Sequence, residues 1–600
     1  MTGTVVDFQR ERNLPTMFFA QAARLGNKPF LWGKGDGGAF TPVTWAAAAA
    51  QVRDLARGLR ALGVGAGDKV ALVAENRPEW LLADLAVMAA GAVTVPTYTT
   101  NTVDDHAYIF EHAEAKAVIV SSAALAARVL PAAGRAGCAL VISLDPAVDG
   151  PAEGPRVLSW AAVAEAGGGD DFDVDAAAAG LDRDAVCCFI YTSGTGGRPK
   201  GVMLSHRAIL ANCHGALEVL RELGVEDEIY LSLLPLSHAY EHTVGLYFPI
   251  GIGAQVYYSG GPDGLSQELA EVRPTLMTAV PRLYEVLHDR ITRGVARAGG
   301  VQAALFQRAV TLGRKAYGDP ASLSFGERLV NGFLTLTVRR KVGKRFGGRL
   351  KAFVSGGAAL NPDIGTFFLA LGVRLLQGYG QTEAAPVISV NPAARIKIHT
   401  VGKALDGVEV KIAEDGEILV RGPLLMDGYW RDQEATAAAI VDGWLHTGDI
   451  GQLDDEGYLE ITDRKKDNNV NAAGAKIAPA KVEGRLTFEP EIAQAMVVGD
   501  KSAYLVAVLV PDEECIAAAA KAAGAPPRLA DLAETPELRA ALTAAVGRAN
   551  ESLSTIERVR HFIVAETPFT TDNGLMTPTL KTRRHAINAV YGDRLQALYG

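Results

Sequence analysis

Cysteine is scarce in this sequence, which has five among its 600 residues. They are irregularly spaced, and they form no CxxC pair or Cys/His cluster: Cys138, Cys187, Cys188, Cys213 and Cys515. A disulfide framework usually has an even number of cysteines, and a zinc site needs ligands at short regular spacings, so neither is supported. The cysteine content therefore favours a reducing, cytoplasmic setting.

A long apolar run is also missing. The most apolar stretch, WLLADLAVMAAGAVTVP from Trp80, meets Asp84 after four residues. Because a membrane-spanning helix needs about 20 apolar residues, we expect a buried helix running into a strand instead. The N-terminal MTGTVVDFQRERNLP carries charges where a secretion signal would be apolar. We therefore expect a soluble chain, and the sequence leaves peripheral contact with a membrane open.

Excess positive charge is absent as well. The 68 acidic and 59 basic residues give a formal net charge of −9. This balance argues against a general nucleic-acid binder, although a local basic pocket for phosphates would not show in a total. The remaining partners to expect are small molecules, and nothing in the sequence sets the oligomeric state.

Strand-like and helix-like segments alternate along the first two thirds of the chain. Val52, Leu55, Leu59 and Leu62 recur at helical spacing before Gly63, and short apolar runs such as KVALVA and AVCCFIYT read as buried strands. Alternation of this kind is typical of helix-covered, mostly parallel sheets, an α/β architecture whose ligands lie beyond the carboxyl ends of the strands.

The pattern changes near residue 402 to short alternating strands with tight turns, which predicts a small β-rich subdomain over residues 402–464. After the charged DRKKD segment, residues 463–467, strands and helices mix again. We therefore expect an N-terminal domain over residues 1–464 and a small mobile α+β domain over residues 465–600, with a hinge near Lys466.

One loop, YTSGTGGRPKG at residues 191–201, combines glycines, hydroxyls and a lysine. Glycine backbone N–H groups can converge on phosphate oxygens, and hydroxyls and a lysine add to such a cradle. A Walker A loop fails because Pro199 and Gly201 flank Lys200, and the glycine spacing of a Rossmann loop fails too. A plain surface turn is the alternative reading.

This loop resembles, at ten of eleven positions, the signature [YF]TSGTTGxPKG of the adenylate-forming superfamily, which includes acyl-CoA synthetases, peptide-synthetase adenylation domains and firefly luciferase. Gly196 stands where the family usually has Thr. The resemblance implies that the loop holds the β- and γ-phosphates of ATP through these residues: Thr192, Ser193, Gly194, Thr195, Gly196, Gly197 and Lys200.

Further family motifs follow in the family's order. SGGAAL resembles the loop that borders adenine, QGYGQTE the aromatic–Gly–x–Thr–Glu motif, LHTGDIG the ribose-binding aspartate motif, and DRKKD the hinge. The residues that these motifs imply for nucleotide binding are Gly356, Gly357, Ala358, Gln377, Gly378, Tyr379, Gly380, Gln381, Thr382, Asp449, Arg464 and Lys466.

The resemblance also assigns chemistry to single residues. Tyr379 would stack on adenine, Thr382 would contact the α-phosphate, and Asp449 and Arg464 would bind the ribose hydroxyls. Mg²⁺ would be held by Glu383 and Thr195. Lys581, in TPTLKTRR, would drive adenylation, and a pantetheine tunnel for coenzyme A would open near Gly474.

Several of these residues have a plainer interpretation. Without its motif, Glu383 would be interpreted as a solvated carboxylate, Asp449 as a turn residue, and Lys581 as part of a solvated basic face. Glu383 follows GYGQT, Asp449 stands in TGD and Lys581 follows NGLMTPT, and these positions favour a role in the active site. His238, in PLSHAYEH, is a candidate catalytic residue, with a satisfied core histidine as the alternative.

Together the motifs imply ATP-dependent conversion of a carboxylate to acyl-AMP and then to an acyl-CoA. PLSHAYEHTVGLYFPI and NGLMTPTLK resemble the long-chain fatty acyl-CoA synthetase branch, with an apolar tunnel after His238. Asn468 and Asn469 depart from the apolar pair usual after DRKKD, and Ala475 from the usual glycine. The alternatives are loading of a carrier protein, a medium-chain or aromatic acid as substrate, and a nucleotide-binding regulatory protein on the same fold.

Overall fold

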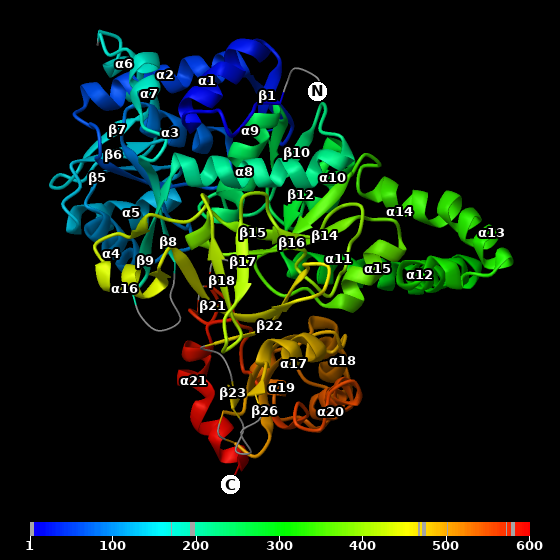
Figure 1. Ribbon diagram of the computed structural model, residues 1–600. Helices are drawn as coiled ribbons and strands as arrows, with labels where there is room; N and C mark the ends of the chain where they lie inside the picture. The colour runs from blue at the N-terminus through cyan, green and yellow to red at the C-terminus, as the bar shows by residue number, and fades with distance from the viewer. Residues whose placement is uncertain are drawn as a thin grey trace.

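The computed structural model describes residues 5–35, 37–169, 171–192, 198–465, 469–470, 476–500, 502–571, 573–577 and 582–599. Figure 1 shows a large body built from most of the chain, a helical arm that projects from one side, and a smaller unit formed by the C-terminal residues. The candidate residues outside the described residues are Ser193, Gly194, Thr195, Gly196, Gly197, Lys466, Asn468, Gly474, Ala475 and Lys581.

Two mixed, mostly parallel sheets form the body. The first has nine strands in spatial order β16 (Lys403–Ala404), β15 (Val387–Val390), β14 (Leu375–Gly380), β13 (Ala352–Ser355), β12 (Leu276–Ala279), β10 (Ile229–Ser232), β11 (Gln255–Tyr258), β1 (Pro29–Lys34) and β2 (Phe40–Thr44). The second has eight, β19 (Gly428–Tyr429), β9 (Lys200–Ser205), β8 (Val186–Thr192), β4 (Val93–Pro96), β3 (Lys69–Val73), β5 (Ala115–Val120), β6 (Leu140–Ser143) and β7 (Arg156–Ser159).

Helices cover these sheets and contribute to one buried core that links both. They are α1 (Leu14–Leu25), α2 (Trp45–Ala61), α3 (Pro78–Ala89), α4 (Val103–Ala113), α5 (Ala123–Arg135), α6 (Trp160–Ala166), α7 (Val174–Gly180), α8 (His206–Leu220), η1 (Arg221–Leu223), η2 (Glu241–Tyr247), α9 (Phe248–Ile252), α10 (Leu265–Val272), α15 (Pro362–Ala370) and η5 (Thr382–Ala384). The apolar run from Trp80 forms a buried helix followed by a strand, as predicted, and no described helix is long and apolar enough to cross a membrane.

A third, antiparallel sheet lies at the lower edge of the body. It contains β17 (Glu409–Ile412), β18 (Glu417–Arg421), β20 (Ile440–Val441), β21 (Trp444–Leu453) and β22 (Leu459–Arg464), with α16 (Gln433–Ala439) between them. Two short strands of the same segment, β16 and β19, pair instead with the two large sheets. The β-rich segment is therefore joined to both large sheets by backbone hydrogen bonds.

The C-terminal residues have a separate hydrophobic core, which runs from Ile477 to Leu595. Its elements are β23 (Asn469–Val470), β24 (Lys476–Ile477), α17 (Pro479–Leu486), β25 (Ile492–Val498), β26 (Leu505–Pro511), α18 (Glu513–Ala523), α19 (Leu529–Leu532), α20 (Pro536–Glu551), β27 (Val559–Val564), α21 (Arg584–Gln596) and η6 (Ala597–Tyr599). The predicted fold class, α/β with a smaller mixed unit at the C-terminal end, is thus confirmed.

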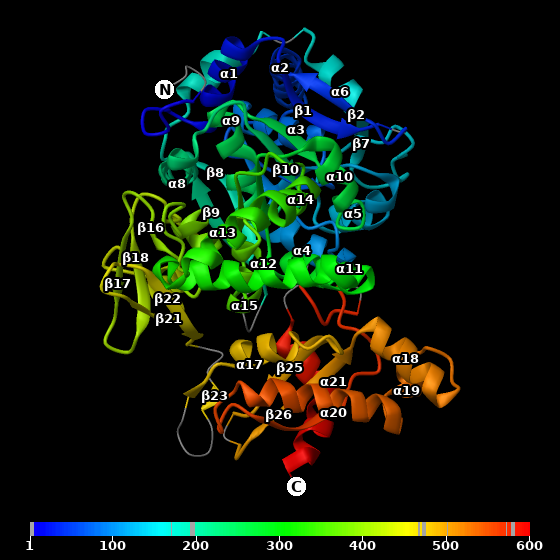
Figure 2. The same cartoon turned by 90° about the vertical axis from the view of Figure 1, so that its right-hand side faces the viewer.

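The arm is inserted between the adjacent strands β12 and β13. It consists of α11 (Pro281–Ala298), α12 (Gly300–Gly318), η3 (Pro320–Ser322), α13 (Phe325–Leu334), η4 (Thr335–Arg339) and α14 (Arg340–Arg345). In Figure 2 the arm faces the viewer, with α11 and α12 running across the molecule above the C-terminal unit. Because β12 and β13 are parallel neighbours, the arm leaves the sheet at the carboxyl end of β12.

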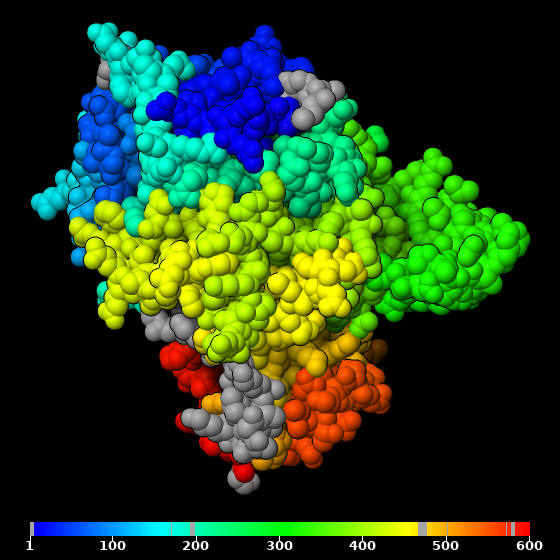
Figure 3. All heavy atoms as spheres, in the orientation of Figure 1, coloured from blue at the N-terminus to red at the C-terminus, as the bar shows by residue number. Residues whose placement is uncertain are grey.

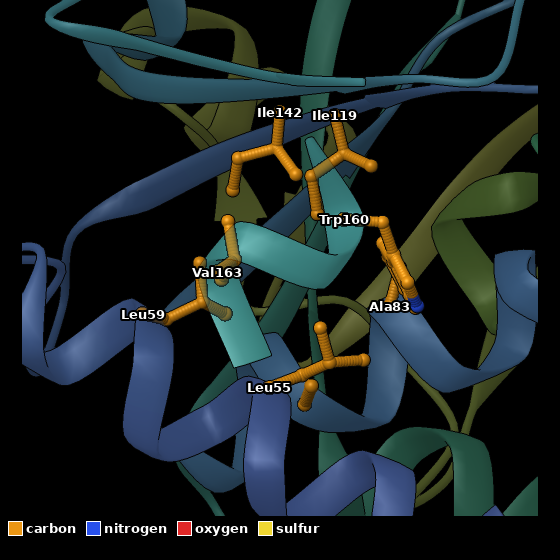
Figure 4. A pocket seen from close by; sticks show the side chains of 8 residues that line it. Leu55, Leu59, Ala83, Ile119, Ile142, Trp160 and Val163 are labelled. Atoms are coloured by element: carbon orange, nitrogen blue, oxygen red, sulfur yellow. The ribbon is translucent and has the colours of Figure 1, made fainter. Parts of the chain in front are cut away.

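Close backbone packing occurs where α2 meets α6, beside a small apolar pocket. Figure 4 shows Leu55 and Leu59 of α2 pointing into this pocket toward Val163 and Trp160 of α6. A Cβ atom on Gly58 would lie 1.9 Å from the Val163 carbonyl oxygen. The two helices can therefore approach this closely only because residue 58 is glycine.

We expect Gly58→Ala to lower the free energy of unfolding by about 2 kcal/mol or more, because α6 must move away from α2. The control is Gly294→Ala in α11, where a Cβ meets nothing within 4 Å. That change should raise stability by about 0.5–1 kcal/mol through helix propensity. Denaturant unfolding measures both, and equal effects of the two variants would contradict the packing argument.

Candidate nucleotide-binding site

The candidate site lies at the carboxyl ends of β13 and β14, which pair in parallel register. Ser355 and Gln377 are register partners there, so SGGAAL and QGYGQTE emerge side by side. This is the edge at which open α/β sheets bind their ligands. Gly378 and Gly380 pack too closely against β15 for a side chain, since a Cβ would lie 3.0 Å and 1.8 Å from backbone oxygens. These two glycines therefore allow the end of β14 to pack directly against the neighbouring backbone.

The glycine-rich loop is the connection of a hairpin formed by β8 and β9. Thr192 and Lys200 are the last register partners before the loop, and Tyr191 pairs with Gly201. Two contacts hold its base against α4, because the Tyr108 hydroxyl donates to the Pro199 carbonyl at 2.9 Å and His112 Nδ1 lies 2.8 Å from the Tyr191 hydroxyl. The described flanks therefore have fixed positions beside α4.

Tyr429 connects this hairpin to the QGYGQTE segment. Pairing of β19 with β9 places Tyr429 opposite Val202. Its hydroxyl donates to Glu383 Oε1 at 2.8 Å, and Lys200 Nζ lies 5.0 Å above its ring. Lys200 Nζ also lies 3.3 Å from Asp432 Oδ2. Tyr429 thus contacts both a cation at the start of β9 and a carboxylate in η5, which follows β14 of the other large sheet.

The protonation of Glu383 is set by competing effects. Burial raises the pKa of its carboxyl, while the Tyr429 hydrogen bond and the charge of Arg464 lower it. The net shift is upward. One Glu383 oxygen accepts from Tyr429, and the carboxylate retains lone pairs for a further ligand.

A second cluster joins Tyr379, Asp449 and Arg464. The Tyr379 hydroxyl donates to Asp449 Oδ2 at 2.6 Å, and Arg464 Nε donates to Oδ1 at 2.8 Å. Asp449 and Arg464 face each other as register partners of β21 and β22. The Asp449 side chain is buried, whereas half of Arg464 is exposed. The carboxylate next to Tyr379 raises the pKa of that phenol in addition to burial.

Gln377 Oε1 and Gln381 Nε2 are among the buried polar atoms at this edge that have no hydrogen-bond partner among the described residues. An unpaired buried polar atom costs about 1–3 kcal/mol, which a ligand that pairs with it would recover. An amide oxygen and an amide N–H₂ match the donors and acceptors of a nucleobase and a phosphate. The residues present therefore fit a nucleotide.

The described residues contain no group of three or more His, Cys, Asp or Glu side chains that could hold a metal by themselves. This donor set still fits Mg²⁺, which is commonly bound by one or two carboxylates together with substrate phosphates. Glu383 supplies the described carboxylate. Thr195, the other predicted ligand, lies outside the described residues.

His238 lies two residues before Tyr240, whose ring packs against Gly356 of the SGGAAL loop. The Tyr240 N–H donates to His238 Nδ1 at 3.1 Å, so the neutral ring carries its proton on Nε2. The Tyr240 ring packs where a Cβ on Gly356 would be, 3.2 Å away. Tyr240 thus connects His238 to the adenine-side loop, while Gly357 and Ala358 are exposed at its tip.

The segment after His238 forms the fully buried π-helix η2. Glu241 at its start accepts hydrogen bonds from Ser232 at 2.7 Å, Thr278 at 2.5 Å and Tyr230 at 3.2 Å. Burial raises the pKa of Glu241 to about 7 against these three donors. The predicted tunnel lining therefore carries a buried carboxyl, which its apolar composition did not indicate.

The structure thus brings together Lys200, Glu383, Tyr379, Asp449 and Arg464. Thr382 lies in η5 directly before Glu383 and donates no side-chain hydrogen bond to a described residue.

Sequence reasoning missed Tyr429 and Asp432. The available signal was the polar and aromatic segment DGYWRD at residues 427–432, whose Trp430 N–H donates to the Gly201 carbonyl at 2.8 Å.

Family comparison agrees with this geometry. A model of AMP-binding enzymes matches residues 18–430, and a model of the C-terminal domain of AMP-binding enzymes matches residues 466–600. The chain belongs to the AMP-binding, adenylate-forming enzyme family. At this level it is an AMP-forming acid–thiol ligase.

Similar family members include the long-chain-fatty-acid–CoA ligase FadD15 of Mycobacterium tuberculosis, which is 35% identical over 94% of this chain and 93% of its own. The peroxisomal long chain acyl-CoA synthetase 7 of Arabidopsis thaliana is 31% identical over 94% of this chain and 82% of its own. Mouse long-chain-fatty-acid–CoA ligase 6 is 31% identical over 89% of this chain and 79% of its own.

Solved structures of other family members have the same fold. The A domain of a carboxylic acid reductase from Segniliparus rugosus, in complex with AMP and a co-purified carboxylic acid, superposes with a TM-score of 0.77 over 99% of this chain and 96% of its own, at 21% identity. The anthranilate CoA ligase AuaEII, in complex with anthranoyl-AMP, superposes with a TM-score of 0.72 over 99% of this chain and 100% of its own, at 19% identity.

The raised pKa of Glu241 predicts a pH dependence of stability. Between pH 4.5 and 7 the folded state binds more protons at this carboxyl than the unfolded state does, so the free energy of unfolding falls as pH rises. The loss is on the order of 3 kcal/mol and is complete above the folded-state pKa.

Glu241→Gln mimics the protonated acid and should remove this component. Urea unfolding at pH 5 and pH 8 measures it, as the difference in pH dependence between the parent chain and the variant. The same pH dependence in both chains would show that Glu241 does not titrate in this range.

Proposed function

We propose that this enzyme is a long-chain fatty acid–CoA ligase, which uses ATP to convert the acid to acyl-AMP and then transfers the acyl group to coenzyme A. The observation that carries the proposal is the Tyr379–Asp449–Arg464 cluster beside the Glu383–Tyr429–Lys200 contact, at the carboxyl ends of β13 and β14. Relatives named as long-chain fatty acid–CoA ligases, at 31–35% identity, support the choice of acid.

In this proposal the buried residues at the ends of β13 and β14 bind the adenosine part of ATP. Asp449 accepts hydrogen bonds from the ribose hydroxyls in place of the one it now accepts from Tyr379, and Arg464 holds the carboxylate in position. The Tyr379 ring stacks on adenine, between Gly380 and the loop at Gly356. Gln377 and Gln381 supply the unpaired oxygen and N–H₂ that the nucleotide satisfies.

The triphosphate extends toward the β8–β9 hairpin. Lys200 exchanges its ion pair with Asp432 for contact with the phosphates. Because that ion pair is exposed, breaking it costs at most about 1 kcal/mol. Residues 193–197 lie outside the described residues, and we propose that their backbone N–H groups, with the hydroxyls of Thr192, Ser193 and Thr195, would bind the β- and γ-phosphates. Mg²⁺, bound through Glu383 and Thr195, would neutralise charge on the transferring phosphate.

The first step is an in-line displacement. A carboxylate oxygen of the fatty acid bonds to the α-phosphorus, and the bond from that phosphorus to the bridging oxygen breaks, releasing pyrophosphate. Thr382 contacts the α-phosphate and Lys581 adds a positive charge, so that negative charge building up on the phosphoryl oxygens is stabilised. No side-chain nucleophile is needed, because the acid itself attacks.

In the second step the coenzyme A sulfur bonds to the acyl carbon, AMP leaves with the shared oxygen, and the thiol proton passes to solvent. We propose that residues 465–600 rotate about Lys466 between the steps, removing Lys581 and opening a pantetheine path near Gly474. The ion pairs between this unit and the body support such motion, since they are partly exposed, as between Arg485 and Asp363 at 2.6 Å.

A panel of acids from short to long chain, with ATP and coenzyme A, tests the proposal. Pyrophosphate release and thioester formation should be greatest with long-chain acids. Greatest activity with medium-chain or aromatic acids would overturn the choice of substrate. Adenylation without transfer to free coenzyme A would favour a carrier protein as acceptor, and nucleotide binding without pyrophosphate release would favour a regulatory role.

Lys581→Ala should separate the two steps. We expect fatty-acid-dependent pyrophosphate release to fall at least about 100-fold, because the variant lacks the cation that stabilises the phosphoryl transition state. Conversion of supplied acyl-AMP and coenzyme A to acyl-CoA should continue. Arg583→Ala, a neighbouring cation, is the control and should keep both activities. Equal loss of both steps in Lys581→Ala would refute the division of labour.

Tyr429→Phe should change the pH profile of pyrophosphate release. The Tyr429 hydroxyl stabilises the charged form of Glu383, so removing it raises the Glu383 pKa further. Since the carboxylate is the active form, the acidic limb of the profile should move to higher pH, with a smaller effect at alkaline pH. Tyr317→Phe, at a tyrosine distant from Glu383, is the control. An unmoved acidic limb would mean that Tyr429 does not position Glu383.

A further inference from the structure

The tip of the helical arm exposes an unusual amount of apolar surface. Phe325, Leu329, Phe333 and Leu336 lie at spacings of four, four and three residues along α13 and η4, so they form one stripe on a single helical face. Between 55% and 79% of each residue is exposed. Scattered apolar residues on a surface are ordinary, but a contiguous stripe of two Phe and two Leu marks an interaction surface.

This stripe is not the face that holds the arm together. Leu334, on the opposite side of α13, is fully buried against Ala309 and Leu312 of α12, and Val338 packs onto the same cluster. The arm therefore has its own packing without the stripe. Figure 3 shows it projecting from the body with its outer surface open.

Cations continue the stripe. Arg340 and Lys344 follow Leu336 at four-residue spacings in α14, and Lys341, Arg345 and Arg349 flank them. All five side chains are exposed, and none forms an ion pair with a described residue. Residues 281–349 contain 14 Lys and Arg against 4 Asp and Glu, a net charge of +10 in a chain whose total is −9.

The occupant that matches both features is an anionic lipid bilayer. A helix that lies in the interface buries an apolar face among the acyl chains while Lys and Arg contact anionic headgroups. A second copy of the chain is disfavoured, because a two-fold contact would place one +10 arm against another. Charge complementarity therefore points to lipid.

We propose that the stripe formed by Phe325, Leu329, Phe333 and Leu336, with Arg340 and Lys344, docks this protein on anionic membrane surfaces. The arm is inserted between β12 and β13, and the second of these strands ends in the adenine-side loop. When the tip of the arm is docked, the distance between the nucleotide site and the membrane is therefore no greater than the length of the arm. The inference rests on surface chemistry and does not depend on which acid the enzyme activates.

Co-sedimentation of the full chain with vesicles tests the proposal. Vesicles of equimolar phosphatidylglycerol and phosphatidylcholine should bind the protein at least about tenfold more tightly than vesicles of phosphatidylcholine alone. Raising the salt concentration should weaken this binding, since screening shortens the range of the attraction.

Two variants separate the apolar and charged contributions. Phe325→Asp with Leu329→Asp should lower vesicle binding about tenfold or more, whereas Val590→Asp, at an exposed valine of α21, should not. Arg340→Glu with Lys344→Glu should abolish the preference for phosphatidylglycerol. The matched control is Lys28→Glu with Lys521→Glu, at exposed lysines outside the arm. All these side chains are exposed, and unchanged thermal unfolding verifies folding.

Phe333→Trp gives an independent readout. Brominated lipids should quench its fluorescence beyond the quenching seen in the parent chain, because residue 333 enters the acyl region. Equal vesicle binding by arm and control variants would overturn the proposal. It would equally be overturned by a parent chain that ignores both vesicle types while Phe325→Asp with Leu329→Asp converts a dimer to a monomer in sedimentation, since the stripe would then cover a second copy.

Discussion

The site depends on the pairing of a two-residue strand, β19, with β9. This pairing carries Tyr429 from the β-rich segment to the edge of the eight-stranded sheet, where its ring meets Lys200 and its hydroxyl meets Glu383. Glu383 lies in η5, which connects β14 to β15 of the other large sheet. A few backbone hydrogen bonds thus set how far the Lys200 ammonium lies from the Glu383 carboxylate, the two groups that we propose bind the phosphates and the metal.

The second cluster is positioned in the same manner, by register. Asp449 and Arg464 face each other because β21 and β22 are antiparallel, and Tyr379 reaches them from the end of β14. Each part of the site therefore joins two sheets. A body made of three adjoining sheets can hold polar residues from distant segments at hydrogen-bonding distance, without a dedicated loop for each.

The sequence predicted the regular part of this arrangement well. Runs such as KVALVA and AVCCFIYT became β3 and β8 because buried parallel strands are continuously apolar, and the ordered motifs pointed to Asp449 and Glu383 as candidate site residues. Tyr429 escaped notice because a strand of two residues has no periodicity to detect. Glu241 was hidden for a different reason, since only tertiary packing shows that Ser232, Thr278 and Tyr230 surround it. The π-helix itself has no signature in a pattern of apolar residues.

The contact between the body and the C-terminal unit has a thermodynamic consequence. Its described ion pairs join Arg485 to Asp363, Arg293 to both Asp512 and Glu514, and Arg297 to Glu514, and each of these six side chains is more than one quarter exposed. Exposed pairs of this kind contribute about 0–1 kcal/mol each, and water replaces them readily. We therefore propose that the relative orientation of the two units lies on a shallow free-energy surface, on which a bound nucleotide or acyl group of modest affinity would select one arrangement over another.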